Sequence, residues 1–256
     1  MRLTILGCSG SFPGPDSPSS GYLLESGGTR IVLDLGNGTM GAMQRFLDPF
    51  QLDAVFLSHL HPDHCADFGA LTVLRRYHPN PPYDATERRL PVIAPENAPE
   101  RLAALYAPNA AELAETDLSD VFEFIPISAE PVRIGPFEVQ AVPVAHLCAA
   151  WGFRVAAEDK VLAYTGDTGP CPQLTELAAD ADVLLSEASW ADFPDAPDGV
   201  HLSGRQAAEV AKAARARRLL LTHLVPWADR DAIIAEAIAT FDGPTELVGP
   251  DRTYDV

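Results

Sequence analysis

Short apolar runs of strand length recur from one end of the chain to the other. Gly, Pro, Asp or Asn bounds each run, which is the pattern of strands separated by turns. The strands predicted in this way are Leu3–Leu6, Tyr22–Leu24, Ile31–Leu33, Ala54–Leu57, Val92–Ala94, Phe137–Val142, Phe153–Ala156, Val161–Tyr164, Val183–Leu185 and Leu219–Leu221.

Between some of these runs, apolar residues recur about every 3.6 positions, which indicates amphipathic helices. The predicted helices are Thr39–Leu47, Ala66–Tyr77, Pro99–Tyr106, Pro172–Ala178, Gly204–Ala216 and Arg230–Thr240. The first half is rich in closely spaced strands, whereas the later part alternates strand and helix. This order predicts an α/β protein with two sheets face to face and helices outside. Because no repeat or linker divides the chain, we expect one domain over residues 1–256.

Charge and composition narrow the range of functions. The 256 residues include 18 basic and 36 acidic side chains, a net charge of −18, which argues against a general binder of long DNA or RNA. No apolar run approaches the roughly 18 residues that a membrane span needs, and the N-terminal segment lacks a signal-peptide pattern. We therefore expect a cytoplasmic protein without membrane contact. The four cysteines stand singly, which favours reduced thiols.

Three of the seven histidines fall within the segment 58–64, Ser-His-Leu-His-Pro-Asp-His. A predicted strand precedes this segment and a predicted helix follows it, so the side chains lie on a strand-to-helix turn that can aim them at one point. Neutral imidazole and carboxylate ligands suit zinc, manganese or iron. The alternative is a polar turn in which the histidines cap the helix.

With His-x-His-x-Asp-His at the end of a strand, the sequence resembles the metallo-β-lactamase fold superfamily. The resemblance continues in order along the chain with His146, Asp167 and His223, each of which follows a predicted strand. The segments Leu6-Gly-Cys-Ser-Gly-Ser and Ile31-Val-Leu-Asp-Leu-Gly are also similar to the opening hairpin of that fold. The resemblance implies a four-layer αββα sandwich of two mixed sheets, with helices outside.

The resemblance also implies a site for two divalent metal ions. All seven ligand positions of the family are filled. One metal would be held by His59, His61 and His146, and the second by Asp63, His64 and His223, with Asp167 bridging both. Zinc is the expected metal, with manganese and iron as the alternatives, because His and Asp ligands accept all three.

Two further features resemble the ribonuclease Z and phosphodiesterase branch of the superfamily. Residues 185–190, Leu-Ser-Glu-Ala-Ser-Trp, are similar to its His-Glu-Ala-Thr loop, with Ser186 in place of the histidine. The resemblance implies that Glu187 orients His201, which contacts the scissile phosphate or protonates the leaving oxygen. The alternative for His201 is a residue that only precedes a helix capped by Ser203. The expected catalytic residues are Asp63, His201 and Glu187.

The spacing between His146 and Asp167 bears on the substrate. Residues 147–166 leave room for two strands and a turn, but not for the long arm that the family's transfer-RNA processing enzymes carry there. Together with the net charge, this favours a small phosphodiester. The sequence most resembles actinobacterial-type phosphodiesterases of this fold, which open cyclic nucleotides, so 3′,5′- or 2′,3′-cyclic AMP is the expected substrate.

Several alternatives remain open at this point. The chain can be a metallo-hydrolase of thioesters, lactones or β-lactams, a ribonuclease Z-like RNA-processing enzyme, or a scaffold without activity. The loop Gly7–Gly21 can bind a phosphate, frame the mouth of the site, or simply connect a hairpin. Trp190 and Trp227 can stack on a base or belong to the packing. A homodimer is an option because dimers are common among relatives.

Overall fold

The computed structural model describes all 256 residues and contains two sheets of seven strands each. The first sheet has the spatial order β14 (Thr253–Asp255), β1 (Arg2–Gly7), β2 (Gly21–Ser26), β3 (Thr29–Leu33), β4 (Ala54–Phe56), β5 (Leu90–Ala94) and β6 (Phe122–Pro126). The second has the order β13 (Thr245–Leu247), β12 (Leu219–Thr222), β11 (Val183–Glu187), β10 (Lys160–Tyr164), β9 (Trp151–Ala157), β8 (Phe137–Pro143) and β7 (Val132–Ile134).

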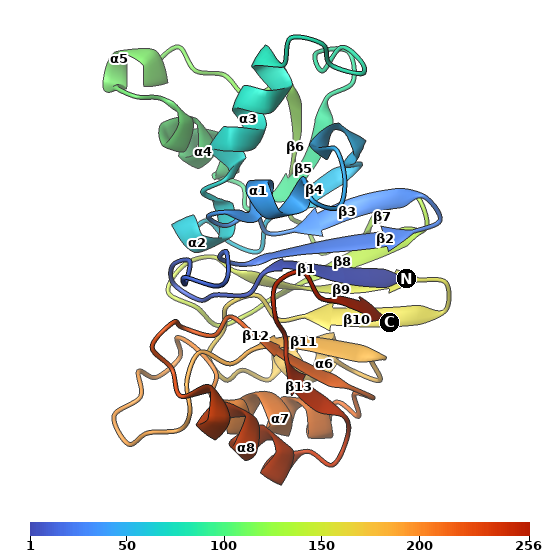
Figure 1. Cartoon of the computed structure of the whole chain (residues 1–256), viewed down its shortest axis with the longest axis vertical. Coiled ribbons are helices and arrows are strands. Elements are labelled where there is room, and N and C mark those ends of the chain that lie inside the picture. The colour runs from blue at the N-terminus through green and yellow to red at the C-terminus, as the bar shows by residue number, and fades with distance from the viewer.

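Helices cover the outer face of each sheet (Figure 1). Those beside the first sheet are α1 (Thr39–Met43), α2 (Pro62–Cys65), α3 (Phe68–Tyr77), α4 (Ala98–Tyr106) and α5 (Ala110–Leu113), with a 3-10 helix at Pro49–Gln51. Those beside the second are α6 (Gln173–Leu177), α7 (Gly204–Ala213) and α8 (Arg230–Thr240). The predicted four-layer αββα sandwich of two mixed sheets is therefore confirmed.

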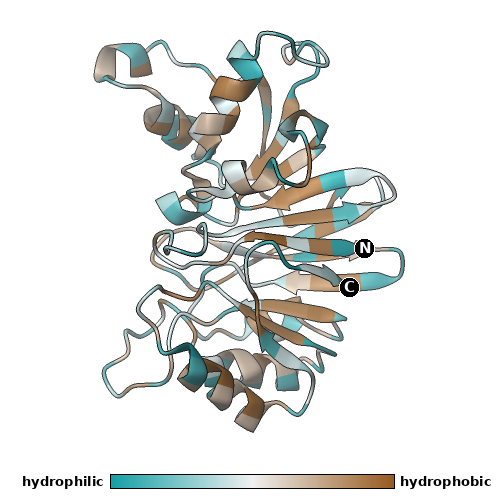
Figure 2. Cartoon of the chain, viewed as in Figure 1, coloured by the Kyte–Doolittle hydropathy of each residue, from teal (hydrophilic) through white to brown (hydrophobic).

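The strand sequences explain the layers, because alternate side chains of a strand point to opposite faces. In β3, Ile31 and Leu33 belong to the core between the two sheets, whereas Val32 packs under the helices of the first sheet. In β11, Leu185 lies between the sheets and Leu184 under the helices of the second. Figure 2 shows the apolar residues concentrated along these strands. Each sheet is thus buried on both faces, as its near-continuous apolar runs require.

The direction of the strands decides where the polar loops meet. Strands β3 to β6 are parallel to one another, and so are β10 to β13, so within each set the carboxyl ends share one edge of the sheet. The loops after β4, β10, β11 and β12 carry most of the predicted site residues. Isolated bridges tie the loops of the two sheets together, such as that between Ser9 and Leu224. The fold therefore gathers these side chains at one end of the sandwich.

Several boundaries differ from the sequence-based expectation. Strands β6, β7, β13 and β14 were not predicted; all four are short and lie at the edges of the sheets. The predicted helix Ala66–Tyr77 begins at Phe68, with Asp67 in the capping position, and the Asp67 carboxylate accepts a hydrogen bond from the backbone N–H of Met40 in α1. The predicted helix Gly204–Ala216 ends at Ala213, close to Arg215, which adopts a left-handed backbone conformation.

None of the helices combines the length with the apolar character that crossing a bilayer requires.

The start of α7 leads to a prediction about stability. Ser203 and Gln206 form a capping box, in which each side chain bonds the other residue's backbone N–H. We expect Ser203→Ala to lower the free energy of unfolding by about 1 kcal/mol, since two N–H groups at the helix start lose or loosen their partners. Urea unfolding measures this. Ser128→Ala, in an exposed loop, is the control; an equal loss in both variants would contradict the role of the cap.

Candidate metal centre

The histidine-rich turn after β4 is built so that its polar side chains point inward. His61 has an extended backbone and Pro62 starts the single turn of α2, which directs the side chains of Asp63 and His64 into the protein. His59 and His64 are fully buried. Proline is favoured at this first helical position because it has no N–H to leave unpaired. The turn therefore presents imidazoles and a carboxylate on one side.

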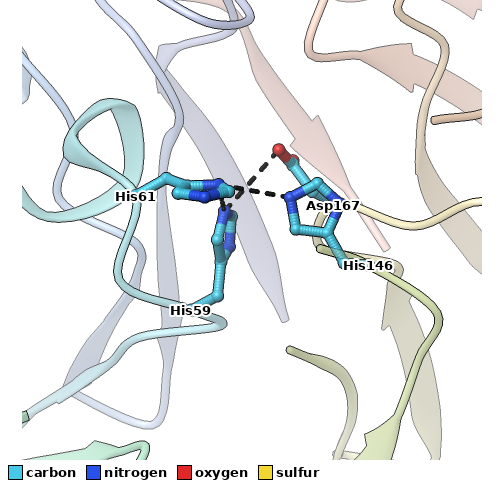
Figure 3. A group of neighbouring side chains, drawn as sticks. All are labelled: His59, His61, His146 and Asp167. Atoms are coloured by element: carbon cyan, nitrogen blue, oxygen red, sulfur yellow. Dashed lines mark hydrogen bonds and ion pairs between the residues drawn. The ribbon is translucent and has the colours of Figure 1, made fainter. Parts of the chain in front are cut away.

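Four of the predicted ligands form a first group, from three separate loops (Figure 3). The distance from His59 Nε2 to His61 Nδ1 is 3.0 Å, and that from His146 Nε2 to the same His61 atom is 3.2 Å. Asp167 Oδ2 lies 3.7 Å from His59 Nε2. The structure thus brings together His59, His61, His146 and Asp167, with their ligand atoms all within 4.8 Å of one another.

The second group contains the other predicted ligands and shares Asp167 with the first. His64 Nε2 lies 3.1 Å from Asp167 Oδ1, and His223 Nε2 lies 3.2 Å from both Asp167 Oδ2 and Asp63 Oδ2. All seven predicted positions therefore meet in two groups joined by one carboxylate. This is the arrangement that the sequence resemblance implied, and their role as ligands stays a prediction.

The chemistry of the donor atoms fits divalent cations. His64 Nε2 and Asp167 Oδ1 are buried and face each other at 3.1 Å, but neither forms a well-oriented hydrogen bond with a group of the protein, which is costly for polar atoms unless another partner is bound. Burial lowers the pKa of His59 and of His146, which favours the neutral imidazole that binds metal. Ligand atoms about 2.0–2.1 Å from a tetrahedral zinc ion lie about 3.3 Å apart, close to the nitrogen separations observed here.

Asp34 was missed from the sequence and supports this site from behind. Its buried carboxylate accepts hydrogen bonds from Ser58 N–H, Ser58 Oγ and Tyr164 OH, and it lies 2.7 Å from His64 Nδ1. Burial opposes protonation of His64, but the carboxylates of Asp167 and Asp34 outweigh it and hold the pKa of His64 well above its usual value. Such outer carboxylates orient metal-binding imidazoles. In the sequence, Asp34 is marked only as a lone acidic residue at the end of an apolar strand.

Glu187 holds His201 beside the second group. Glu187 Oε1 lies 2.9 Å from His201 Nδ1 and also accepts the backbone N–H of Thr168. Its other oxygen accepts from Leu202 N–H and Ser189 Oγ. Burial favours a lower pKa for His201, but the charge and the hydrogen bond of the Glu187 carboxylate together outweigh this and raise the pKa of His201 to about 9. With all these partners the carboxylate cannot swing away, so it fixes the position of the His201 ring.

The cap at Ser203 does not remove His201 from the site, and the catalytic role of His201 stays a prediction. Ser203 does cap α7, and His201, two residues earlier, still faces the site with 12% of its side chain exposed. Its ring centre lies 5.4 Å from that of His146 and 5.2 Å from that of His223, so it adjoins one member of each group. Ser186, in contrast, is buried and bonds only backbone.

The glycine-rich loop and the two tryptophans have different environments. In the loop Gly7–Gly21, a Cβ on Gly10 would stand only 2.8 Å from His223 Nδ1, so this backbone packs directly against a predicted ligand. Trp190 lies edge-on to His201, with ring centres 5.1 Å apart. Trp227 is 69% exposed and pairs with the exposed ring of Phe12.

Comparison with known proteins agrees with this geometry. The family described as Beta-lactamase superfamily domain matches residues 29–224 of the chain. The chain belongs to the beta-lactamase superfamily. Its relatives include the uncharacterized protein ML1173 of Mycobacterium leprae (strain TN), 45% identical over 259 residues, covering 100% of this chain and 89% of that protein.

Other members of the superfamily are similar over nearly the whole chain. The probable metallo-hydrolase YhfI of Bacillus subtilis (strain 168) is 28% identical over 249 residues, which cover 96% of each protein. The crystal structure of YhfI matches with a TM-score of 0.84 at 25% identity, covering 99% of both chains. Human tRNase Z, short form, shares the fold with a TM-score of 0.77 at 21% identity, covering 100% of this chain and 99% of that one. The protein is thus a metallo-hydrolase of the beta-lactamase superfamily.

Asp167 offers a direct test of the metal centre. Asp167→Ala removes the one carboxylate that both groups share and leaves the five imidazoles of the two groups without it, so we expect metal content to fall below one equivalent per chain. Elemental analysis of the purified protein measures this. Asp242→Ala, which removes an exposed carboxylate, should retain the wild-type content; a fully metallated Asp167→Ala protein would show that Asp167 bridges nothing.

The contact between Gly10 and His223 gives a second test. A Cβ at Gly10 would also stand 2.6 Å from the His223 carbonyl oxygen, whereas the nearest atom to a Cβ at Gly14 is 3.5 Å away. We therefore expect Gly10→Ala to displace His223 and weaken metal affinity roughly tenfold or more, as loss of support around a ligand does. Gly14→Ala in the same loop should leave the affinity unchanged. Competition with a chelator measures both, and equal affinities would argue against the packing role.

Proposed function

We propose that this metallo-hydrolase is a dinuclear-metal phosphodiesterase acting on a small phosphodiester, with a cyclic nucleotide, 3′,5′- or 2′,3′-cyclic AMP, as its substrate. The observation that carries the proposal is the His201–Glu187 pair beside both ligand groups. Hydrolysis of a thioester releases a thiolate, which leaves without a proton, whereas cleavage of an alkyl phosphodiester releases an alkoxide that needs a proton donor.

Two divalent ions, for which we propose zinc before manganese or iron, would act as Lewis acids on the phosphoryl group and as activators of water. His59, His61 and His146 would hold one, Asp63, His64 and His223 the other, and Asp167 both. Five of these seven side chains are buried, and those of His61 and His146 are partly exposed. Asp63 has the most exposed carboxylate of its group, at 8%, so it is placed to accept a hydrogen bond from the attacking water.

His201 supplies the proton for the leaving group. Its Nδ1 is held by Glu187, so Nε2 is the nitrogen left to face the substrate. As water adds to phosphorus, it gives up one proton to solvent, and the bond from phosphorus to the ester oxygen breaks, with its electron pair going to that oxygen. The oxygen takes the proton from His201 Nε2 and leaves as an alcohol. Solvent later returns a proton to His201. Glu187 keeps its hydrogen bond to Nδ1 throughout and holds the ring in place.

Two observations favour a small substrate over long RNA. Between His146 and Asp167 the chain forms only β9, β10 and short connections, without an inserted arm. The net charge of −18 repels a polyanion, whereas a single phosphodiester needs only the local field of the metal centre. Processing of RNA, the activity named for human tRNase Z, is therefore the second candidate.

The test of this proposal compares two leaving groups. We expect His201→Ala to keep its metals but to lower turnover of cyclic AMP by roughly 10² to 10⁴, the usual contribution of a positioned general acid. Turnover of bis-p-nitrophenyl phosphate should fall much less, because p-nitrophenolate leaves without a proton. Steady-state rates on both substrates, with metal content measured in parallel, decide the matter.

Glu187→Gln is the companion variant and should show the same pattern more weakly, since it only loosens the orientation of the His201 ring. An equal loss on both substrates would mean that His201 binds phosphate or shapes the site, and its role as proton donor would be wrong. Wild-type turnover of a thioester with neither phosphodiester cleaved would overturn the proposal as a whole.

A further inference from the structure

A cavity of about 880 Å³ shares a wall with the loop after β8, which carries His146. Its wall includes Trp151, whose backbone N–H donates to the carbonyl of Ser58, the residue before His59, at 3.0 Å. Ala149, three residues after His146, forms another part of the wall. The cavity is within the size range of pockets that bind small molecules, about 300 to 1,000 Å³. It therefore adjoins the side of the centre formed by His59 and His146.

The sheet topology explains why a substrate would extend into this space. The metal-binding turn follows β4, and the cavity wall contains Asn97 after β5 and Ile127 after β6. Because β4, β5 and β6 are parallel neighbours, these segments follow one another along a single edge of the first sheet. In open sheets of parallel strands, ligands bind outside the carboxyl ends. The cavity continues that edge directly beyond the metal centre.

The polar groups of the cavity have no partners within the protein. The Arg101 guanidinium takes part in no hydrogen bond or ion pair, although most other arginines of this acidic chain do. Asn97 precedes α4 in the capping position, yet its side chain makes no capping hydrogen bond. The carboxylates of Glu96 and Glu100, also in the wall, are exposed and unpaired. The cavity thus offers an amide, a guanidinium and two carboxylates to a ligand.

The charges and hydrogen-bonding groups of the cavity determine which kind of ligand it can bind. Two carboxylates against one guanidinium leave one net negative charge, which disfavours a second phosphate or a carboxylate. The half-buried Trp151 ring provides an aromatic surface, and a guanidinium also packs on planar groups. Asparagine pairs with the amine and ring nitrogen of adenine, and a carboxylate accepts from an exocyclic amine. A neutral planar base that carries an amino group meets all of these requirements.

We propose that this cavity binds the nucleobase of the substrate and selects adenine, through Trp151, Asn97 and the two glutamates. The inference rests on the proposed phosphodiesterase function, since it places the base of that substrate in this cavity. It also assigns Trp151, rather than Trp190 or Trp227, as the tryptophan that contacts the base.

Binding can be measured without turnover. In a Trp190→Phe/Trp227→Phe protein, Trp151 is the single tryptophan, and adenosine should quench its fluorescence in a saturable manner. Inosine, which lacks the amino group, should bind about tenfold more weakly, and Asn97→Ala should weaken adenosine binding by a similar factor. Asn109→Ala is the matched control, because Asn109 precedes α5 in the same capping position but caps that helix with its own side chain.

Kinetics give the second measurement. Asn97→Ala should raise the KM for cyclic AMP about tenfold with kcat little changed, and it should leave turnover of bis-p-nitrophenyl phosphate, which has no base, unaltered. Trp151→Leu should act in the same direction, and Asn97→Ala keeps the test decisive if that variant folds poorly. Trp227→Leu should leave the KM for cyclic AMP unchanged.

The outcomes separate the two proposals. If adenosine does not quench Trp151, or if Asn97→Ala and Asn109→Ala bind it equally, the base site is wrong while any phosphodiesterase activity stands. A raised KM in Trp227→Leu alone would likewise place the base elsewhere. If adenosine binds as expected but neither phosphodiester is cleaved, the base site stands and the proposed reaction fails.

Discussion

The arrangement of the site depends on one buried carboxylate. Asp167 lies within 3.7 Å of three imidazole nitrogens, those of His59, His64 and His223. Burial raises the pKa of Asp167, but the neighbouring imidazoles outweigh that effect and hold it well below its usual value. A buried anion of this kind is stable only beside positive charge. Cations at this point would satisfy it, together with the donor atoms that lack hydrogen bonds.

Two further buried carboxylates, behind the ligand groups, also bind imidazoles of the site. Asp34 fixes His64, and Glu187 fixes His201, and in each case backbone or hydroxyl donors occupy the remaining carboxylate lone pairs. Ser189 Oγ links the layers, since it donates to Glu187 and lies 3.0 Å from His223 Nδ1. The imidazoles of the site are therefore held by groups that are themselves fixed by several hydrogen bonds, which is how a site keeps its geometry without its ligand.

The two-sheet fold and the histidine-rich turn could be predicted because both are local patterns, whereas His146, Asp167 and His223 stand singly and were implied only by the resemblance to the superfamily. Apolar runs bounded by turns mark the strands, and a compact histidine motif marks the metal turn. Asp34 was not predicted because one acidic residue after a strand forms no local pattern. Its role is visible only in the folded protein, where Ser58, His64 and Tyr164 contact its carboxylate. Edge strand β6 was missed for a related reason: Glu123 and Pro126 interrupt its apolar pattern, and its pairing with β5 defines it. The cavity beside the metal centre likewise exists only where three loops meet.

The backbone of His223 has a left-handed conformation, with φ of 55°. This conformation costs a residue other than glycine about 1 to 2 kcal/mol. The surrounding contacts hold it there, including the close packing of Gly10 and the bridge from Ser9 to Leu224. Metal bound by His223, as proposed above, would therefore be linked to the ordering of the loop Gly7–Gly21. By reciprocity, a factor that orders this loop would tighten the binding of that metal, and the metal would order the loop to the same extent.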